Sequence, residues 1–233
     1  MKKILILGAS SDIGFKVTKL FLNQDWQVYA HFNSQSRNLK KIINKNLKLI
    51  QLNFLDSSEN IDKKIDFLKN INFDGFVNLT GYIDNRGFTN FDLEECINAL
   101  KVNTIVPLLI LKQIHKLMIK SKFGRILLTS SIGTKFGGGK NTFCYSLSKK
   151  ANEFIPRDYK LWAEKNVLIN CLIIGVTDTK IHKRIHKKYK KIRKNLIPIK
   201  RMAKAEEIAK YIFFLINDNS YITGQVISIS GGE

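Results

Sequence analysis

Short apolar runs alternate along the chain with longer segments in which apolar residues recur at helical spacing. The short runs lie between glycine or polar positions, which is typical of strands buried on both faces of a sheet. The predicted strands cover residues 4–7, 26–32, 47–52, 74–79, 125–129, 167–173 and 225–229.

Helix signals fill the segments between these strands. Ile13 and Val17 begin an apolar helical face after the first strand, and Ser57 is suited to cap a helix after the third. Asp92 and Glu95 have capping-box spacing and open a long helix. The further helices expected are a polar one after residue 32, that long one over 92–120, one over 141–164 with a kink at Pro156, and one over 205–217.

Strands that alternate with helices predict a parallel sheet covered by helices on both faces. The chain of 233 residues contains no linker, repeat or low-complexity boundary that would divide it. The sequence therefore predicts an α/β fold: one Rossmann-type, doubly wound domain over residues 1–233, with a mostly or fully parallel seven-stranded sheet.

Composition narrows the class of protein. An apolar fraction of 44% and a charged fraction of 25% are typical of a soluble globular protein. No apolar run approaches the ~18 residues of a membrane span, and the apolar start of the chain meets a glycine turn too early for a signal peptide. Cys96, Cys144 and Cys171 are widely spaced and lack metal-ligand spacing, which predicts a reduced, cytoplasmic protein without a metal site.

The formal net charge of +20 is unusual for this class. Such a charge suits a nucleic acid, an acidic partner or an anionic substrate. The chain is also rich in Lys, Asn and Ile together, which favours a broad compositional bias over a dedicated patch. We therefore disfavour a nucleic-acid partner and expect no membrane partner.

A glycine turn, GASSDIG at residues 8–14, lies between the first strand and the first helix. Glycine lets the backbone approach a pyrophosphate, and a helix N-terminus offers free N–H groups and the positive end of a dipole. A glycine pair alone is also compatible with a tight turn. Its place after strand one and before an amphipathic helix favours nucleotide binding.

A second chemical signal lies at residues 129–151, where Tyr145 and Lys149 are four residues apart. That spacing places both on one face of a helix, and a nearby ammonium favours the ionised form of a phenol. Ser130 or Ser131 is close enough in sequence to share a substrate oxygen. The spacing alone also fits a surface helix that carries Tyr and Lys by chance.

Several motifs in one order make the chain resemble a short-chain dehydrogenase/reductase. They are GASSDIG, VNLTG at 77–81, KVN at 101–103, SS followed by YSLSK, and YITGQVISISGG near the end. The resemblance covers essentially the whole length and is closest to the 3-oxoacyl-carrier-protein reductase type. It implies hydride transfer from a nicotinamide cofactor and a homotetramer or homodimer packed through the long helices.

The resemblance assigns catalysis to Asn103, Ser131, Tyr145 and Lys149. Ser131 would hydrogen-bond the substrate carbonyl, and Tyr145 would donate a proton to it, with a pKa lowered by Lys149 and by the positive nicotinamide of the oxidised cofactor. The sequence adds a reason for Asn103. Because Pro107 has no N–H, the Asn103 carbonyl loses its helical donor, and we expect it to hold a water that relays protons to Lys149.

Some positions depart from the family pattern. Asp12 stands where a glycine is usual, either near the pyrophosphate or as a helix cap. Leu79-Thr80 replaces Asn-Ala, Asn53 replaces an Asp that holds the adenine, and Ile174 replaces a proline before Gly175. None removes a catalytic group.

Cofactor choice is expected to depend on residues 31–37, HFNSQSR, which contain no acid to accept the ribose hydroxyls of NAD. Their donors and Arg37 suit a 2′-phosphate, so NADP(H) is favoured over NAD(H). Alternatively, Arg37 and Lys40 only decorate a solvated helix. The predicted cofactor contacts are Gly8, Ser10, Ser11, Asp12, Ile13, Gly14, His31, Asn33, Ser34, Arg37, Asn53, Phe54, Asn78, Gly81, Gly175, Thr177 and Thr179.

A basic segment follows the sixth strand. Residues 180–194 hold nine Lys or Arg and no acid, with an apolar stripe that continues to Leu196. By resemblance, residues 177–200 form a lid over the substrate, and its charge suits an anionic substrate or carrier such as an acyl-carrier protein, a CoA thioester or a phosphorylated sugar. A lysine-rich solvated helix with a buried stripe is the alternative.

The leading functional hypothesis is therefore an NADPH-dependent carbonyl reductase, with a 3-oxoacyl thioester among its candidate substrates. A sugar or polyol dehydrogenase, including one in glycan-precursor biosynthesis, is the alternative within enzymes. A cofactor-binding regulator on the same scaffold is the alternative outside them, although such proteins usually lose the Tyr or Lys that this chain keeps.

Overall fold

The computed structural model describes residues 1–36, 38–179 and 187–233. Its centre is one seven-stranded sheet in the order β3-β2-β1-β4-β5-β6-β7, and every neighbouring pair is parallel. The expected doubly wound fold is confirmed. The strands are β1 Lys3–Leu7, β2 Gln27–Phe32, β3 Leu47–Gln51, β4 Gly75–Asn78, β5 Gly124–Ser131, β6 Val167–Ile174 and β7 Val226–Ile229.

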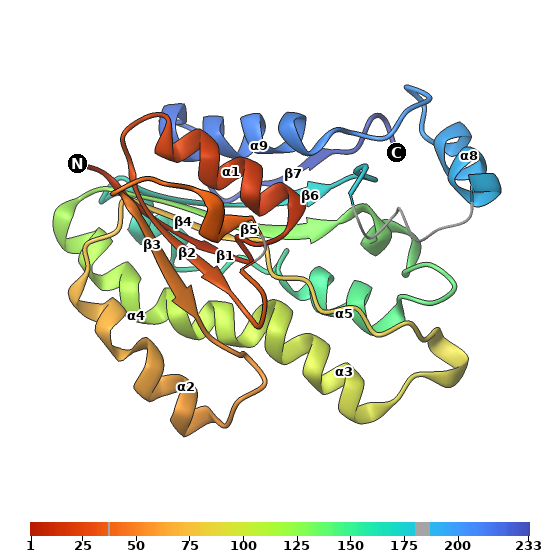
Figure 1. Cartoon of the computed structure of the whole chain (residues 1–233), viewed down its shortest axis with the longest axis horizontal. Helices are drawn as coiled ribbons and strands as arrows, with labels where there is room; N and C mark the ends of the chain where they lie inside the picture. Colours follow the sequence, from red (N-terminus) through yellow and green to blue (C-terminus); the bar gives the residue numbers. More distant parts are fainter. Residues whose placement is uncertain (37, 180–186) are drawn as a thin grey trace.

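Helices cover both faces of the sheet (Figure 1). On one face α1 and α9 pack together over a core that includes Val17, Phe21 and Ile212. On the other face α2 and α4 pack over a second core that includes Ile61 and Ile114. The α-helices are α1 Asp12–Leu22, α2 Ser58–Ile65, α3 Leu93–Leu100, α4 Val106–Ser121, α5 Phe143–Ala151, α6 Tyr159–Ala163, α8 Lys187–Leu196 and α9 Ala205–Phe213.

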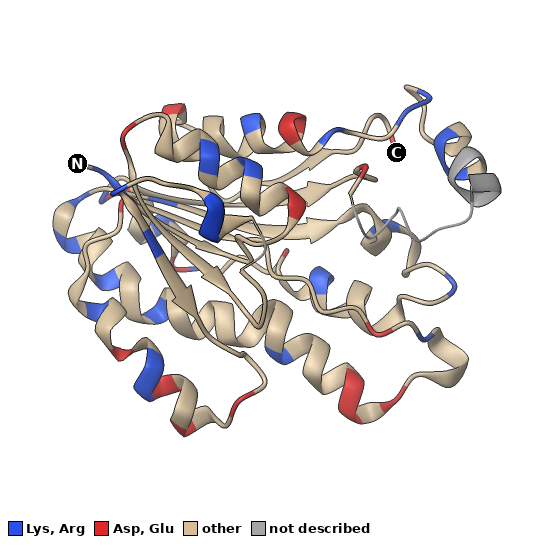
Figure 2. Ribbon diagram, in the orientation of Figure 1, with Lys and Arg blue, Asp and Glu red and all other residues tan. Residues whose placement is uncertain are grey.

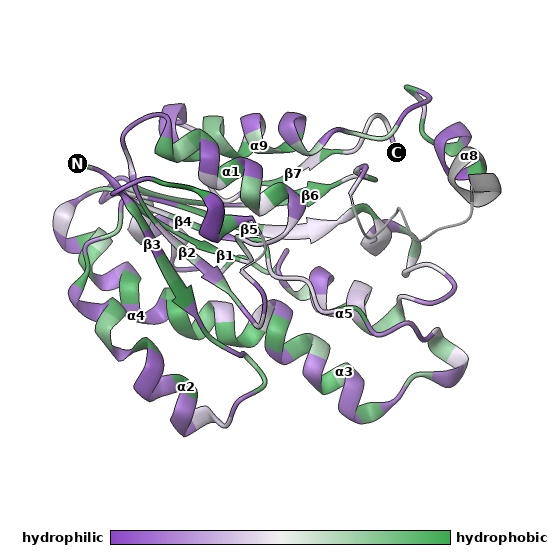
Figure 3. Cartoon of the chain, in the orientation of Figure 1, coloured by the Kyte–Doolittle hydropathy of each residue, from purple (hydrophilic) through white to green (hydrophobic). Residues whose placement is uncertain are grey.

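The central strands are apolar along their length, as parallel strands buried on both faces require (Figure 3). β1 and β4 lie in the middle of the sheet, and Leu5 and Phe76 are paired in register and fully buried. Because all strands run in one direction, their carboxyl ends share one edge, where loops from distant parts of the sequence meet.

Two predicted helices differ in the structure. The polar helix expected after β2 is only a 3-10 turn, Leu39–Lys41, of which Leu39 alone is buried. The helix expected over residues 141–164 is broken rather than kinked, because α5 ends at Ala151 and α6 begins at Tyr159. Pro156 lies in the interruption, and the Tyr159 N–H bonds to its carbonyl to start the next helical turn.

One continuous helix, Leu93–Ser121, is long and apolar enough to cross a membrane by length and composition, which corrects the expectation that no segment approaches this size. It comprises α3, a π-helical segment Lys101–Ile105 and α4. Ile110, Ile114 and Met118 are buried against the sheet, so this is a core helix of the domain.

Charge is spread over the molecule. Figure 2 shows Lys and Arg on the outer helices of both faces, interspersed with Asp and Glu. Exposed Lys63, for example, pairs with Glu59 one turn earlier on α2, at 2.6 Å. This spread is what a broad compositional bias predicts.

Candidate active site

The glycine turn connects β1 to α1, and main-chain atoms pack closely around its glycines. Gly8 has a φ of +74°, and a Cβ on it would lie 2.6 Å from the Leu79 carbonyl oxygen. A Cβ on Gly14 would lie 2.4 Å from the Gly8 carbonyl oxygen. Both positions therefore require glycine. The side chain that caps α1 is Ser11, whose Oγ accepts from the Gly14 N–H at 3.0 Å, so the cap is not Asp12.

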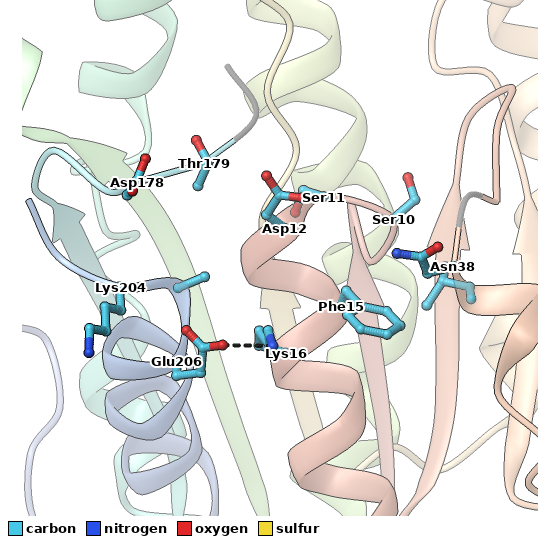
Figure 4. A pocket seen from close by; sticks show the side chains of 12 residues that line it. Ser10, Ser11, Asp12, Phe15, Lys16, Asn38, Asp178, Thr179, Lys204 and Glu206 are labelled. Carbon is cyan, nitrogen blue, oxygen red and sulfur yellow. Dashed lines mark ion pairs between the residues drawn. The ribbon is translucent and has the colours of Figure 1, made fainter. Parts of the chain in front are cut away.

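A pocket of about 390 Å³ opens beside the N-terminus of α1 (Figure 4). It unites four predicted cofactor contacts, since Ser10, Ser11 and Asp12 from the glycine turn face Thr179 from the loop after β6. An ion pair between Lys16 and Glu206 at 2.6 Å ties α1 to α9 below it. The other lining residues, which the sequence did not indicate, are Phe15, Lys16, Asn38, Leu39, Asp178, Lys204, Ala205 and Glu206.

His31, a predicted cofactor contact, is buried instead. Its Nδ1 accepts from the Gly8 N–H at 3.2 Å, and its Nε2 lies 2.9 Å from the Leu52 carbonyl oxygen. Its ring stacks on Phe54, with centroids 4.4 Å apart. Burial lowers the pKa of His31 to about 4, against an opposing effect of the bond to Leu52. A neutral His31 thus supports the glycine turn from behind, and buried Phe54 has no side-chain face to offer a ligand.

The other contacts predicted near strand ends fall into two groups. Asn33, Ser34 and Asn53 are exposed beyond β2 and β3, and the Asn53 Oδ1 accepts from the Leu55 N–H at 3.1 Å. Arg37 lies outside the described residues. Two are turned inward: Ile13 packs against the core, and the Asn78 Oδ1 accepts from both the N–H and the hydroxyl of Thr80.

The remaining predicted cofactor contacts are two glycines and two threonines in the loops after β4 and β6. Gly81 is exposed, and a Cβ there would meet nothing within 4 Å. Gly175 lies so close to β7 that a Cβ would come within 2.5 Å of the Ser230 Cα. The Thr177 hydroxyl donates to the Gly175 carbonyl at 3.0 Å, so only its backbone can face a ligand, whereas Thr179 lines the pocket.

The predicted catalytic groups gather where β5 ends and α5 begins. Ser131 is the last residue of β5, and half-buried Tyr145 lies in the first turn of α5. A hydrogen bond joins the Ser131 and Tyr145 side chains. The Lys149 Nζ lies 6.0 Å from the centroid of the Tyr145 ring. The i,i+4 spacing thus acts as the sequence predicts, with both side chains on one helical face.

The structure separates the two candidate serines. The Ser130 hydroxyl donates to the Glu153 carboxylate at 2.7 Å, and the Thr134 hydroxyl donates to the same oxygen at 2.8 Å. Burial raises the pKa of Glu153, but the hydrogen bonds from Lys150, Ser130 and Thr134 outweigh it and hold that pKa below its usual value. Ser130 is therefore committed to a structural contact, and Ser131 is the serine beside Tyr145.

The expected lowering of the Tyr145 pKa is not found in the protein alone. Burial raises the pKa of Tyr145, and the hydrogen bond with Ser131 opposes this only in part. Burial also lowers the pKa of Lys149 to about 8, against an opposing effect of Cys171. Tyr145 is thus a protonated phenol at neutral pH, which is the form that can donate.

Lys149 is held by backbone oxygens. It is 3% exposed, and its Nζ donates to the Thr80 carbonyl at 2.7 Å and to the Thr129 carbonyl at 3.3 Å. The Thr129 hydroxyl in turn donates to the Asn78 carbonyl at 2.6 Å, which links β5 to β4. Neither threonine is marked by a sequence signal, because the contacts are made by main-chain oxygens.

Asn103 lies in the π-helical segment before Pro107. Its Oδ1 accepts from the Tyr82 N–H at 2.6 Å, and its Nδ2 donates to the Ser148 hydroxyl at 2.9 Å. Its carbonyl accepts from the Asn78 Nδ2 at 3.0 Å and from the Asn152 Nδ2 at 3.1 Å. The carbonyl is freed from the helix as expected, and the two groups that donate to it are side-chain amides.

The basic segment is described only in part. Residues 180–186 lie outside the described residues, and α8 is the helical remainder of the segment. The expected buried stripe is wrong where side chains are described, since Ile192 is 49% and Leu196 64% exposed. Arg193 forms an ion pair with Glu233 at 2.5 Å, which connects α8 to the segment that follows β7.

The candidate proton donor and the pocket beside the glycine turn therefore lie at the same edge of the sheet, where the strands end. The chemistry that this arrangement can perform is the protonation of a substrate oxygen by Tyr145, oriented by Ser131 and backed by a buried cation. Among the described residues, no cluster of His, Cys, Asp and Glu could hold a metal ion. The three cysteines are free and buried.

Known proteins share this architecture. A family model described as enoyl-(acyl-carrier-protein) reductase matches residues 8–233. The 3-oxoacyl-[acyl-carrier-protein] reductase of Buchnera aphidicola subsp. Schizaphis graminum is 28% identical over 99% of this chain and 96% of its own length. The protein of that name from Aquifex aeolicus is 32% identical over 78% of this chain and 75% of its own.

Among solved structures, ElxO with NADP bound has a TM-score of 0.84 to this chain at 26% identity, covering 99% of this chain and 98% of its own. The family model thus spans nearly the whole sequence, and the likeness to the Aquifex relative extends over most of the chain. The protein therefore belongs to the short-chain dehydrogenase/reductase family of NAD(P)-dependent oxidoreductases.

Proposed function

We propose that this oxidoreductase uses NADPH to reduce a carbonyl to an alcohol, and that its substrate is a 3-oxoacyl thioester. The observation that carries the reaction is the Ser131–Tyr145 hydrogen bond with the buried Lys149 ammonium behind it. The relatives named above, which are 3-oxoacyl-carrier-protein reductases, support the substrate class.

The donor set at the sheet edge fits a dinucleotide. The glycine turn offers main-chain N–H groups at the N-terminus of α1, and in the pocket beside it Thr179 lies across from Ser11. Asn33 and Ser34 would reach the ribose of the adenosine, and the Thr177 backbone the carboxamide. The cofactor supplies the hydride when bound.

The protein's own part in the reaction is proton delivery. Ser131 would donate a hydrogen bond to the substrate carbonyl oxygen, and Tyr145 would pass its phenolic proton to that oxygen as the carbon is reduced. The raised Tyr145 pKa keeps this proton in place until the substrate oxygen becomes basic. The Lys149 ammonium then lies next to the tyrosinate and stabilises its charge.

A preference for NADPH over NADH is supported by the residues after β2. Asn33 and Ser34 are exposed at the end of the strand and carry no charge that would repel a phosphate. Titration of the protein with each cofactor, followed by tryptophan fluorescence, tests this preference. We expect a lower Kd for NADPH, and tighter binding of NADH would contradict it.

The substrate class is tested by NADPH oxidation against a panel. The panel holds a 3-oxoacyl thioester, simple ketones, keto-sugars and a phosphorylated keto-sugar. We expect the thioester to have the highest kcat/KM. A keto-sugar with the highest value would instead favour the sugar dehydrogenase hypothesis, and no turnover of any member would contradict carbonyl reduction.

The basic segment supports an anionic group on the substrate, such as an acyl carrier. Lys194 and Lys200 flank the end of α8 and are exposed. Exchanging both for Gln should raise KM for a carrier-linked substrate at low salt and leave KM for a small neutral ketone unchanged. An unchanged KM for the carrier-linked substrate would remove this part of the proposal.

A homo-oligomer is supported by apolar side chains on neighbouring helices. Leu93 is 71% and Ile97 53% exposed on one face of α3, and Leu147 is 45% exposed on α5, which packs beside it. Burial of this face in a second copy would remove that apolar surface from water. Light scattering after size-exclusion chromatography should give a dimer or tetramer, and Ile97→Asp should shift it toward monomer.

A further inference from the structure

His31 is the last residue but one of β2, the strand that lies between β1 and β3 in the sheet (Figure 1). The glycine turn follows β1, and a loop that carries Asn53, the predicted adenine contact, follows β3. The side chain of His31 thus lies between these two segments. It is 4% exposed, so its contacts are with the protein.

On one side, His31 accepts from two consecutive N–H groups of the glycine turn. Its carbonyl accepts from the Ala9 N–H at 2.8 Å, and its ring Nδ1 accepts from the Gly8 N–H at 3.2 Å. Gly8 has a φ of +74°, and its own carbonyl accepts from the Ser11 hydroxyl at 2.8 Å. Any residue could supply the main-chain contact to Ala9, whereas the contact to Gly8 requires an acceptor on the side chain.

On the other side, the ring contacts both chain neighbours of Asn53. Its Nε2 lies 2.9 Å from the Leu52 carbonyl oxygen, and it stacks on Phe54 with centroids 4.4 Å apart and an angle of 7° between the planes. Leu52 and Phe54 are each 3% exposed, whereas Asn53 between them is exposed. The loop is therefore anchored directly beneath Asn53.

These partners determine where the ring carries its proton. The Gly8 N–H is a donor, so Nδ1 must present its lone pair. The proton of the neutral ring is then on Nε2, from which it is donated to the Leu52 carbonyl. The other tautomer would bring two N–H groups together at Gly8 and two lone pairs together at Leu52. Both bonds therefore require one neutral ring in one tautomer.

We propose that His31 is a positioning residue for the cofactor, because its ring holds the glycine turn and the loop around Asn53 at the separation that the adenosine half of a dinucleotide requires. This inference rests on the proposed placement of the dinucleotide at the glycine turn. A site whose parts are held in place before binding loses less conformational freedom when the ligand arrives, so its Kd is lower. The nicotinamide half, which the proposed site places at the loop after β6, should be insensitive to the ring.

The tautomer is tested in the protein without cofactor. NMR of isotope-labelled histidine nitrogens at neutral pH should show His31 with a protonated Nε2 and an unprotonated Nδ1. The chain has four histidines, and the spectrum of His31→Gln identifies the signal that belongs to His31. A proton on Nδ1, alone or together with one on Nε2, would overturn the inference whatever the protein binds.

The effect on binding is tested with a matched pair of variants. Phe54→Leu removes the ring on which His31 stacks and keeps the position apolar. Its control is Phe73→Leu, because Phe73 belongs to the same core, is 0% exposed and packs edge-on against Tyr29. Both variants should lose stability, but only Phe54→Leu should raise the Kd for the cofactor, by about 3-fold to 10-fold. Calorimetry measures Kd, with whichever of NADPH and NADH the wild type binds more tightly.

Two variants of His31 separate its two hydrogen bonds. His31→Asn keeps an acceptor near the position of Nδ1 but does not reach Leu52, whereas His31→Gln reaches Leu52 and loses the acceptor for Gly8. Because the proposal requires both bonds at once, each variant should raise the Kd for the cofactor about tenfold. The Kd for reduced nicotinamide mononucleotide, the half that NADPH and NADH share, should stay at the wild-type value.

The outcomes separate this inference from the proposed function. A wild type that binds neither NADPH nor NADH would contradict the proposed dinucleotide site, and the inference with it. Normal binding by the wild type, with an unchanged Kd in folded Phe54→Leu and in the His31 variants, would overturn the inference alone. An equal rise for the mononucleotide would overturn it too, because the whole site would then be loosened. Should a His31 variant fail to fold, the Phe54 and Phe73 pair and the wild-type spectrum still decide.

Discussion

Two groups of polar side chains lie at the same edge of the sheet and are held in different ways. Behind Tyr145, the side chains of Asn78, Asn103 and Lys149 are buried, and each bonds to another part of the protein. At the end of β2, Asn33 and Ser34 are exposed to solvent. The first group is fixed by the fold, and the second would be ordered by a ligand.

This difference separates the two tasks of the site. A buried network with satisfied hydrogen bonds is already in its working geometry before a ligand arrives, so changes in it should alter rate and stability. The exposed side chains of Asn33 and Ser34, called the rim below, contribute little to the free energy of unfolding. Substitutions there should therefore alter ligand binding alone. The predictions below, from the largest expected effect to the smallest, test that division.

The largest effect is expected for Tyr145→Phe. Loss of the phenolic hydroxyl removes the proton donor and should lower kcat by about 10²-fold to 10⁴-fold. The ring stays in place, so the Kd for NADPH should be unchanged. Stopped-flow and equilibrium titration measure the two quantities. Turnover close to that of the wild type would contradict the assignment of Tyr145.

Glu153→Ala should affect both stability and rate. It leaves the Ser130 hydroxyl without its acceptor, whereas the Thr134 hydroxyl can still donate to the Ser131 carbonyl at 2.8 Å, so the free energy of unfolding should fall by about 1–3 kcal/mol. The strand end that carries Ser131 would be less well held, so kcat should fall. Urea titration and steady-state kinetics measure these changes.

The control for this change is Glu153→Gln, which keeps an acceptor oxygen for both hydroxyls. We expect it to retain most of the kcat that the alanine variant loses. If both variants have equal kcat, Glu153 does not position the serine.

His31 gives the next effect, seen in pH dependence. Its pKa of about 4 lies below the ordinary 6.5, so the unfolded chain binds the proton more readily. Its contribution to stability is therefore complete above pH 6.5 and is lost as the pH falls toward 4. Between about pH 7.5 and about pH 5 the free energy of unfolding should drop by about 2 kcal/mol from this group.

The measurement is urea unfolding at both pH values in the wild type and in His31→Gln. We expect the variant to lose that part of the pH dependence. The comparison variant is His115→Gln, which removes a half-buried histidine on α4, away from the glycine turn. An unchanged slope in His31→Gln would mean that other groups cause the pH dependence.

The sequence was sufficient for the parts of the site that depend on spacing. Short apolar runs between helical segments predicted the parallel sheet, and the four-residue spacing predicted Tyr145 and Lys149 on one face of α5. Pro107 correctly indicated a carbonyl released from the helix at Asn103. Each of these follows from local geometry of the chain.

Other features depend on contacts that local patterns do not encode. The acceptors of Lys149 are the main-chain carbonyls of Thr80 and Thr129, which any residue at those positions could supply. His31 looked like a ligand contact because its strand ends at the site, yet its ring is turned inward to Gly8. Asn152, immediately after α5, donates to the Asn103 carbonyl, which lies on a different helical segment.

The smallest effect concerns the rim, where Asn33→Asp adds a carboxylate at the end of β2. A carboxylate there would accept the ribose hydroxyls of NADH and repel the 2′-phosphate of NADPH. The ratio of the two Kd values should move toward NADH by about tenfold, which is about 1.4 kcal/mol. Because Asn33 is exposed, the free energy of unfolding should be unchanged.

The matched control is Asn72→Asp, which adds the same charge at an exposed position just before β4, at the opposite edge of the sheet. It should leave the Kd ratio unchanged, which separates a local effect from a change in net charge. If Asn33→Asp leaves the ratio unchanged too, the rim does not select the cofactor. A fall in stability would instead show that Asn33 is held by the fold, and that the two groups of polar side chains are not as different as their exposure indicates.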